Sequence, residues 1–379
     1  MDRRTLLKGG AAAGLAAGAA AVSGCDRQEQ AEEQEGGKAP AYATGKRSLK
    51  LVTTWPKNFP GLGTAPERFA RRVDEATDGR LTVKVYAAGE LVPAFEAFDA
   101  VSSGAADMYH GAEYYWQGKS QGFNFFTSVP FGLNAAEMNA WLYYGDGQEL
   151  WDELAAKFNI KPFGCNNSGV QMGGWFNKEI RTLEDFKGLK IRMPGLGGEV
   201  MRRLGAAAVA LPGGEIFQSL QTGAIDATEW VGPWNDLAFG FYRAAKYYYW
   251  PGFHEPGALL SLGINLDLWN DLSQSHKAIV RMACAAETDK GLAEFNARNA
   301  DALRTLTEKH GVQLRRFSDE ILTEVGKVAG GVLSEVAAAD PMTGRIYESF
   351  LKARSDGMFW GRISEEGFAH MRRLPFEFG

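Results

Sequence analysis

The sequence predicts an α/β protein of two domains that are joined by a hinge. Three observations support this fold class. Strand-like and helix-like segments alternate over residues 49–111, which is typical of a mostly parallel sheet covered by helices. The chain leaves this first domain near residue 166 and returns to it near residue 259. Its 379 residues, 45% of them hydrophobic, are enough to bury two cores.

The first 24 residues have the composition of an export signal and not of a folded element. Arg3 and Arg4 precede a weakly apolar run of alanine and glycine, which resembles a twin-arginine signal. A membrane span needs about 20 strongly apolar residues, and this run is too weakly apolar for one. We therefore expect export to the periplasm by the twin-arginine route.

A lipid anchor and a tether are expected directly after the signal. Small residues at 22–24 precede Cys25, as in the lipobox of bacterial lipoproteins, so Cys25 is the expected lipidation site. Plain cleavage without a lipid is the alternative. Residues 25–47 are rich in Glu, Gln, Gly and Ala and predict a flexible tether. Asp26 resembles a signal that retains lipoproteins at the inner membrane.

The first domain is predicted to consist of residues 48–168 and 257–305. Parallel strands need long crossovers between them, and helix-like segments provide these. Two helices are expected between residues 135 and 157, with a break at the glycines of 145–147. The strands are expected at 49–54, 81–87, 106–111, 160–165 and 259–265, and the other helices at 65–76 and 94–103.

The second domain is predicted to span residues 169–256. Because the chain crosses between the domains twice, the crossings form a hinge, and a central cleft lies between the halves. After Asp267 the pattern is helical, so residues 306–379 are predicted to form a helical region. Helices are expected at 273–309, 319–336 and 341–353.

A string from Thr182 to Arg192 ends on a side chain suited to binding a small anion. Apolar residues alternate with Lys190 and Arg192, which predicts a strand with both basic groups on one face. A carboxylate that enters a low-dielectric cleft loses hydration and needs a fixed counter-charge. Arginine provides it best, because its planar fork matches both carboxylate oxygens. An exposed strand arginine is the alternative interpretation of Arg192.

A second string, from Leu220 to Trp230, ends on a carboxylate and an aromatic ring. An apolar helix is predicted to end at Gly223, and a strand at 224–227 leads to Glu229 and Trp230. Ligand residues at strand ends are typical of open α/β sheets.

These strings resemble the solute receptors of tripartite ATP-independent periplasmic (TRAP) transporters, the DctP family. The resemblance extends from Ser48 to about Arg373. Its specific motifs are LEDFKGLKIR at 183–192 and LQTGAID at 220–226, and the segments 171–176, 229–233 and 247–252 are similar to the branch that takes up 2-oxo acids or lactate.

The resemblance implies a fold, a function and partners. The fold is that of type II periplasmic binding proteins, with long C-terminal helices that brace both domains and mediate homodimers. The implied function is to bind a small 2-oxo monocarboxylate such as pyruvate, with a cation, and to present it to the small and large membrane subunits. Lactate or another 2-hydroxy acid is the nearest alternative ligand, and a sugar acid is the next.

The resemblance also implies a site. Arg192 occupies the position of the family's carboxylate-binding arginine. Members of this branch hold a cation between ligand and protein by a glutamine, an acidic side chain and a backbone carbonyl, which correspond to Gln171, Glu229 and the carbonyl of Trp230. Glu255 is a fourth candidate, and a solvated loop carboxylate is its alternative. All are oxygen donors, which sodium and calcium prefer.

Charge counting bears on the identity of the cation. Two glutamates and the ligand carboxylate, set against Arg192, leave a net charge of minus two. Sodium would leave one negative charge, whereas calcium would neutralise the site, so a divalent ion is favoured if Glu255 points inward. Sodium or calcium is therefore the expected cofactor.

Aromatic side chains are expected to wall the pocket. Tyr115 is the candidate for a hydrogen bond to the carbonyl or hydroxyl oxygen of the ligand. Trp175, Trp230 and Trp234 are further candidates, and for each a place in the core is the alternative.

Other classes of function have weaker support. A net charge of −5 does not favour binding to nucleic acid, which is itself negatively charged. The histidines fall in no recognisable metal or triad motif, and His254, near the cleft, is expected to be a partner of the site and not a base. Cys165 and Cys284 predict buried thiols without a disulfide. We expect no catalysis, and the alternatives are a metal-dependent hydroxy-acid enzyme and a structural lipoprotein.

Overall fold

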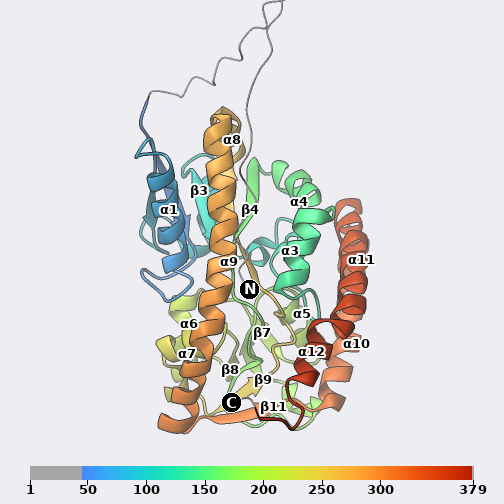
Figure 1. The fold of residues 1–379 in the computed structure, drawn as a ribbon. Helices are drawn as coiled ribbons and strands as arrows, with labels where there is room; N and C mark the ends of the chain where they lie inside the picture. The colour runs from blue at the N-terminus through green and yellow to red at the C-terminus, as the bar shows by residue number, and fades with distance from the viewer. Residues whose placement is uncertain (1–44, 378–379) are drawn as a thin grey trace, which may run out of the picture. The chain divides into compact units, whose positions relative to one another are not determined.

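The computed structural model describes residues 45–377 (Figure 1). These residues belong to one compact unit that begins at Ala43. The predicted export signal and Cys25 lie outside the described residues, as does most of the predicted tether. Arg47, assigned to the tether from sequence, is already the first residue of a strand.

A five-stranded sheet organises the part of the chain that we call the first lobe. Its first three strands are parallel, as predicted, whereas the returning strand runs antiparallel to both of its neighbours. At Gly263 in that strand a Cβ would lie 2.1 Å from the ring of Tyr109, so only glycine permits this pairing. The order is β2 (Leu81–Tyr86), β1 (Arg47–Thr53), β3 (Met108–Gly111), β10 (Leu259–Asn265) and β4 (Ile160–Asn167).

The helices of the first lobe follow the predicted apolar periodicity. In α1, Ala65, Phe69 and Val73 recur at a spacing of four and are buried, and α1 contacts β2. A capping box at Asn134 begins α3. The helices are α1 (Thr64–Ala76), η1 (Ala94–Glu96), α2 (Ala97–Ser102), η2 (Glu113–Trp116), η3 (Gln121–Phe126), α3 (Ala135–Tyr144) and α4 (Gly147–Ala156).

A six-stranded sheet organises the second lobe. Its order is β11 (Gln313–Arg316), β9 (Tyr247–Trp250), β5 (Gly174–Phe176), β8 (Ala227–Thr228), β6 (Lys190–Arg192) and β7 (Ala207–Val209). The short helices between these strands are η4 (Leu183–Phe186), α5 (Gly195–Arg203), α6 (Gly213–Gln221), α7 (Pro233–Phe239) and η5 (Phe241–Arg243). The strand predicted at 224–227 was placed too early, since β8 contains only residues 227 and 228.

The C-terminal region is not entirely helical, and this part of the prediction was wrong. Residues 313–316 form β11, which pairs in parallel with β9 and extends the second sheet. A four-residue edge strand that alternates half-buried and exposed side chains has too little pattern to be recognised alone. The helices are α8 (Leu266–Asp271), α9 (Gln274–Arg304), the π-helical η6 (Thr305–Lys309), α10 (Asp319–Ala338), α11 (Pro341–Ile363) and α12 (Glu365–Met371).

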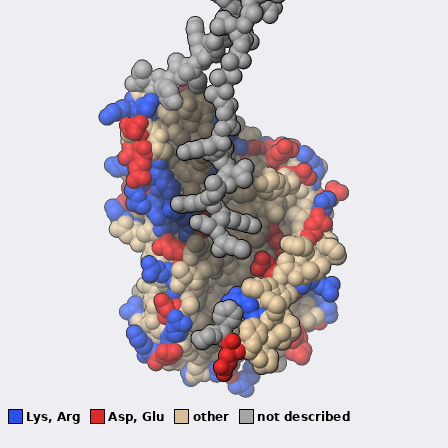
Figure 2. Space-filling view, in the orientation of Figure 1, with Lys and Arg blue, Asp and Glu red and all other residues tan. Residues whose placement is uncertain are grey.

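Two long helices, α9 and α10, connect the lobes. Helix α9 contacts α1 and β4 of the first lobe and α7 of the second, and Figure 1 shows it running past both sheets. Helix α10 contacts α5 of the second lobe and η3 of the first, whereas α11 contacts η3, α3 and α4 of the first lobe. Within residues 45–377, no helix is both long and apolar enough to cross a bilayer. Acidic and basic side chains are interspersed on the face drawn in Figure 2.

Candidate ligand and metal site

The candidate residues lie at strand ends of the second sheet, next to η2 of the first lobe. Arg192 is the last residue of β6, and Glu229 follows β8. These strands are parallel neighbours with Arg192 opposite Thr228, so the two charged side chains emerge at the same edge. Gln171 precedes β5, and Glu255 lies in the loop after β9.

Arg192 and Glu229 form a buried ion pair. Their side chains are 1% and 0% exposed, and Nη1 of Arg192 contacts Oε1 of Glu229. The guanidinium also donates from Nε to the carbonyl of Leu211 at 3.2 Å, and Nη2 lies 3.4 Å from the hydroxyl of Tyr115. It stacks over the ring of Trp230, 5.2 Å from its centroid. The alternative of an exposed strand arginine is therefore wrong.

The environment of Arg192 keeps its guanidinium charged. Burial is the largest single effect and disfavours the charged form, but the Glu229 carboxylate, Tyr115 and Tyr114 together outweigh it, so the pKa of Arg192 rises above its ordinary value. Lys190, two residues earlier, is exposed and donates to the carbonyl of Gly223 at 2.6 Å. Of the two basic side chains in this strand, only Arg192 is buried, so only Arg192 can bind an anion inside the protein.

Glu255 is also buried, so the alternative of a solvated loop carboxylate is wrong. It is 3% exposed. The amide of Gln171 donates to its Oε2 at 2.7 Å, and the backbone N–H of Gln171 donates to its carbonyl at 3.1 Å. Burial, reinforced by the charge of Glu229, raises the pKa of Glu255 well above its usual range, although a hydrogen bond from Tyr114 opposes this. Ionising Glu255 here costs free energy that a cation would offset.

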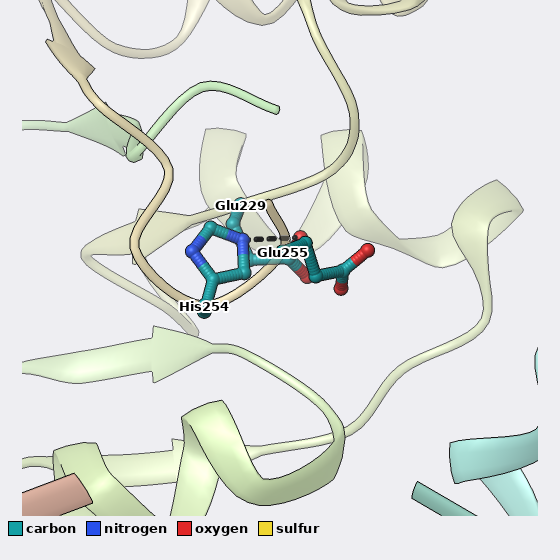
Figure 3. A group of neighbouring side chains, drawn as sticks. All are labelled: Glu229, His254 and Glu255. Carbon is teal, nitrogen blue, oxygen red and sulfur yellow. Dashed lines mark hydrogen bonds and ion pairs between the residues drawn. The ribbon is translucent and has the colours of Figure 1, made fainter. Parts of the chain in front are cut away.

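His254 lies beside the two glutamates and contacts Glu229. Its Nε2 lies 3.2 Å from Oε2 of Glu229, and Figure 3 shows the imidazole facing that carboxylate. One ligand atom from each of Glu229, His254 and Glu255 can be chosen so that all lie within 4.8 Å of one another. No motif in the sequence indicated the contact between His254 and Glu229, because the two residues lie on separate loops.

The donors present fit a cation. Of the two buried carboxylates, only Glu229 is paired with the guanidinium of Arg192. Oε1 of Gln171 is buried with no hydrogen-bond partner among residues 45–377. A buried polar atom without a partner is uncommon and needs an explanation. A cation between Gln171, Glu229 and Glu255 would supply both a ligand for that oxygen and compensation for the carboxylates.

Aromatic rings from both lobes enclose the cluster. The ring centroids of Trp55 and Trp230 are 6.2 Å apart, and Phe59 stacks on Phe239 at 4.2 Å. Trp55 also lies 6.2 Å from Tyr115. We did not single out Trp55 and Phe59 from the sequence, although their position directly after a parallel strand is a usable signal.

Two of the other predicted wall residues have core roles. Trp175 stacks on Tyr248 at 4.1 Å, and its indole N–H donates to Asp236. Trp234 packs against Phe295 of α9, with ring centroids 5.4 Å apart. Cys165 and Cys284 are buried free thiols.

Residues 51–340 match the family model of the bacterial extracellular solute-binding proteins, family 7 (DctP). The chain belongs to this family. The prediction that it is a substrate receptor of the TRAP type is thereby confirmed, as is the two-domain fold class. Family 7 receptors work outside the cytoplasm and bind solutes.

Three relatives of this family 7 receptor are informative. The monocarboxylate 2-oxoacid-binding periplasmic protein of Nostoc sp. (strain PCC 7120) is 42% identical over 323 residues, which is 84% of this chain and 88% of the relative. A TRAP solute-binding protein of Pseudoalteromonas atlantica, solved with bound sodium and pyruvate, is 37% identical with a TM-score of 0.84, covering 88% of this chain and 100% of that one.

The third relative is a TRAP transporter solute-binding protein of Bordetella bronchiseptica. It is 35% identical with a TM-score of 0.85, over 86% of this chain and 97% of that one. Its crystals contain a mixed-occupancy dimer with copurified calcium and picolinate in one site.

Proposed function

We propose that this family 7 receptor binds a small 2-oxo monocarboxylate, such as pyruvate, together with a sodium or calcium ion. The observation that carries the proposal is the buried cluster in which Arg192 faces Glu229 while Gln171 and Glu255 converge beside them. One fixed positive charge among oxygen donors suits an anion and a cation bound side by side. The ligands named for the relatives support the same class.

In this proposal the ligand replaces a contact inside the protein. Arg192 is paired with Glu229 in the structure. A ligand carboxylate would take the guanidinium, with the hydroxyl of Tyr115 beside it, and would leave Glu229 free for the cation. Gln171, Glu255 and the carbonyl of Trp230 would complete the cation's ligands. Calcium would balance the resulting net charge of minus two, and sodium would leave one negative charge.

Opening and closure of the two lobes would admit and hold the ligand. The cluster is buried, and its residues come from both lobes, so a ligand can reach Arg192 only if the lobes separate. Contacts from both lobes would then stabilise the closed state. We propose residues 48–168 with 257–305 as one moving body and 169–256 as the other. β11 belongs with the second body, because it extends the second sheet.

Calorimetric titration of the chain without its export signal tests this function. Pyruvate and lactate are titrated after chelation, and then with added calcium or sodium. We expect saturable pyruvate binding that requires one of these ions and is lost in Arg192→Ala but not in Arg203→Ala, which removes an exposed arginine. Binding only to lactate would change the ligand class, and binding to neither with any ion would overturn the proposal.

Partners and location are part of the same proposal. The receptor delivers its ligand to the small and large membrane subunits of a TRAP transporter in the periplasm. Twin-arginine export and lipidation of Cys25 rest on residues 1–26 of the sequence. We propose no catalysis, so pyruvate recovered after long incubation with the receptor should be chemically unchanged by NMR.

A homodimer through the C-terminal helices completes the proposal. Several apolar side chains from the end of α11 onward are about half or more exposed, which is unusual for a surface that only water contacts. We call these residues the C-terminal apolar patch: Met358, Phe359, Trp360, Ile363, Phe368, Met371, Leu374 and Phe376. A second copy of the chain is the occupant that we propose.

A further inference from the structure

We propose that Asp236 is a positioning residue for the cation site. It holds the backbone after Trp230 in the conformation that presents Glu229 and the carbonyl of Trp230 to the ion. This inference rests on the proposed function, because it concerns the same site. Asp236 itself touches neither the carboxylates of the cluster nor the expected ligand position.

Asp236 is a buried carboxylate that accepts three hydrogen bonds. It lies in the first turn of α7 and is 1% exposed. Its Oδ2 accepts from the hydroxyl of Tyr248 at 2.6 Å and from the indole N–H of Trp175 at 3.0 Å. Its Oδ1 accepts from the backbone N–H of Val231 at 3.3 Å. Only the last of these bonds reaches the loop that carries the site.

The peptide groups around Trp230 are held on both sides. The N–H of Glu229 donates to the carbonyl of Arg192 at 3.1 Å. The carbonyl of Val231 accepts from the N–H of Met172 at 3.0 Å, directly after Gln171. Asp236 therefore holds one residue, Val231, that is also bonded to the segment that supplies Gln171. Displacing Val231 would disturb two of the expected ligand-bearing segments together.

A structural role toward Tyr248 and Trp175 accounts for only one of the two oxygens of Asp236. Burying an ionisable group costs free energy unless it is well bonded, and burial raises the pKa of Asp236 to about 7. Tyr248 and Trp175 already pack against each other by ring stacking. The other oxygen, Oδ1, is the acceptor for the backbone N–H of Val231.

The substitution Asp236→Asn separates these contacts. An amide has one acceptor oxygen, and the closer donors, Tyr248 and Trp175, would keep it. The amide NH₂ would then face the N–H of Val231, so two donors would meet. The second oxygen of Asp236, which holds the loop, is thus lost with little change in side-chain volume.

Calorimetry on the chain without its export signal tests the role. The wild type must first bind pyruvate in a calcium- or sodium-dependent manner, and failure there overturns the proposed function and not this inference alone. With that ion and saturating pyruvate, we expect Asp236→Asn to raise the ion concentration at half-saturation by about tenfold or more, the size reported for groups that orient metal ligands. Melting temperature is recorded in parallel.

Two matched variants make the result decisive. Tyr248→Phe removes a donor to Asp236 but leaves the bond to Val231, so it should lower the melting temperature without the shift in ion dependence. Tyr248→Phe and Trp175→Phe combined with Asp236→Asn remove both competing donors and let the amide oxygen turn to Val231, so most of the ion affinity should return. Equal shifts in Asp236→Asn and Tyr248→Phe, or no shift in Asp236→Asn, would overturn the inference.

Discussion

Arg192, Glu229 and Glu255 are ionisable side chains that are almost completely withdrawn from water. Burial makes their charges depend on one another, because no solvent is present to compensate them. Arg192 compensates Glu229, whereas the hydrogen bonds to the Glu255 carboxylate come from the uncharged side chains of Gln171 and Tyr114. Substitutions that keep charge or shape but change bonding geometry are therefore the sharpest tests at this scale.

We expect Arg192→Lys to lower pyruvate affinity at saturating calcium by at least about tenfold. A lysine keeps the positive charge but cannot offer the planar fork that serves Glu229 and a ligand carboxylate together, and a charge-assisted hydrogen bond contributes about 1.5–3 kcal/mol. Calorimetry measures the change. Arg203→Lys, at an exposed arginine that pairs with Glu335, is the control and should bind normally. Unchanged affinity in Arg192→Lys would contradict the role given to the guanidinium.

Glu113 is predicted to make stability depend on pH. It is buried, one oxygen accepts from the hydroxyl of Tyr109 at 2.7 Å, and burial raises its pKa from 4.5 to about 7. A carboxyl with a raised folded pKa contributes stability that is complete below the unfolded pKa and is lost as pH rises through the folded pKa. The loss falls between about pH 4.5 and pH 7 and amounts to at most about 3 kcal/mol.

Glu113→Gln should remove this dependence, because an amide does not titrate. Urea unfolding at a series of pH values gives the free energy of unfolding of both proteins, and their difference isolates Glu113. The pKa of Asp236 is also raised, but its contribution is common to both proteins and cancels. A difference that stays constant from pH 4.5 to pH 7 would show that Glu113 does not titrate as argued.

At the scale of elements, two short helices support the loop between β8 and α7. Helix α7 supplies Asp236, which holds Val231. Helix α6 begins at Gly213, where a Cβ would lie 2.4 Å from the ring of Trp230. The first turns of α6 and α7 therefore both contact the loop that carries the site. Small substitutions in either turn should change ligand affinity.

Two adjacent glycines of α6 provide a matched test. We expect Gly213→Ala to displace the ring of Trp230 and to lower pyruvate affinity, with an overpacking cost of about 1–3 kcal/mol in stability. At Gly214 a Cβ meets nothing within 4 Å, so Gly214→Ala should bind normally and gain up to about 1 kcal/mol. Calorimetry and thermal unfolding measure both effects. Equal affinities in the two variants would mean that Trp230 does not depend on α6.

At the scale of the whole molecule, the C-terminal helices do two things. Helices α9 and α10 contact elements of both lobes, so they link the bodies that we propose to move. Helix α11 continues ten residues beyond its predicted end at residue 353, and its last turns contain no buried residue after Phe350. This extension exposes the C-terminal apolar patch instead of covering the protein's own core.

We expect Phe359→Glu combined with Ile363→Glu to convert a dimer to a monomer. Two carboxylates in a desolvated apolar interface carry an uncompensated burial cost. Light scattering after size-exclusion chromatography measures the mass. The control, Met282→Glu, changes an exposed methionine on α9 and should leave the mass unaltered. A monomeric wild type, or a double variant that remains dimeric, would refute an interface at this patch.

Local pattern predicted most of the elements but not all of the pairing. The alternation over residues 49–111 and the glycine break between α3 and α4 were visible because neighbouring residues in the chain produce them. β11 was missed and β8 was misplaced, because such short strands are specified by partners in distant segments. The boundaries of the two moving bodies, as well as the roles of the site residues, stay predictions.

The sequence by itself indicated the family and the two-lobed α/β fold. It also singled out the candidate site residues, which stay predictions: Gln171, Arg192, Glu229, Trp230, Tyr115 and Glu255. Motif and residue chemistry are properties of the chain, and they identify which side chains could bind an anion and a cation. Only the tertiary structure decided that Arg192 pairs with Glu229, that Glu255 is buried, and that His254 contacts this site while Asp236 holds the loop beside it. Burial and pairing depend on atoms brought together from separate loops, and no local pattern records them.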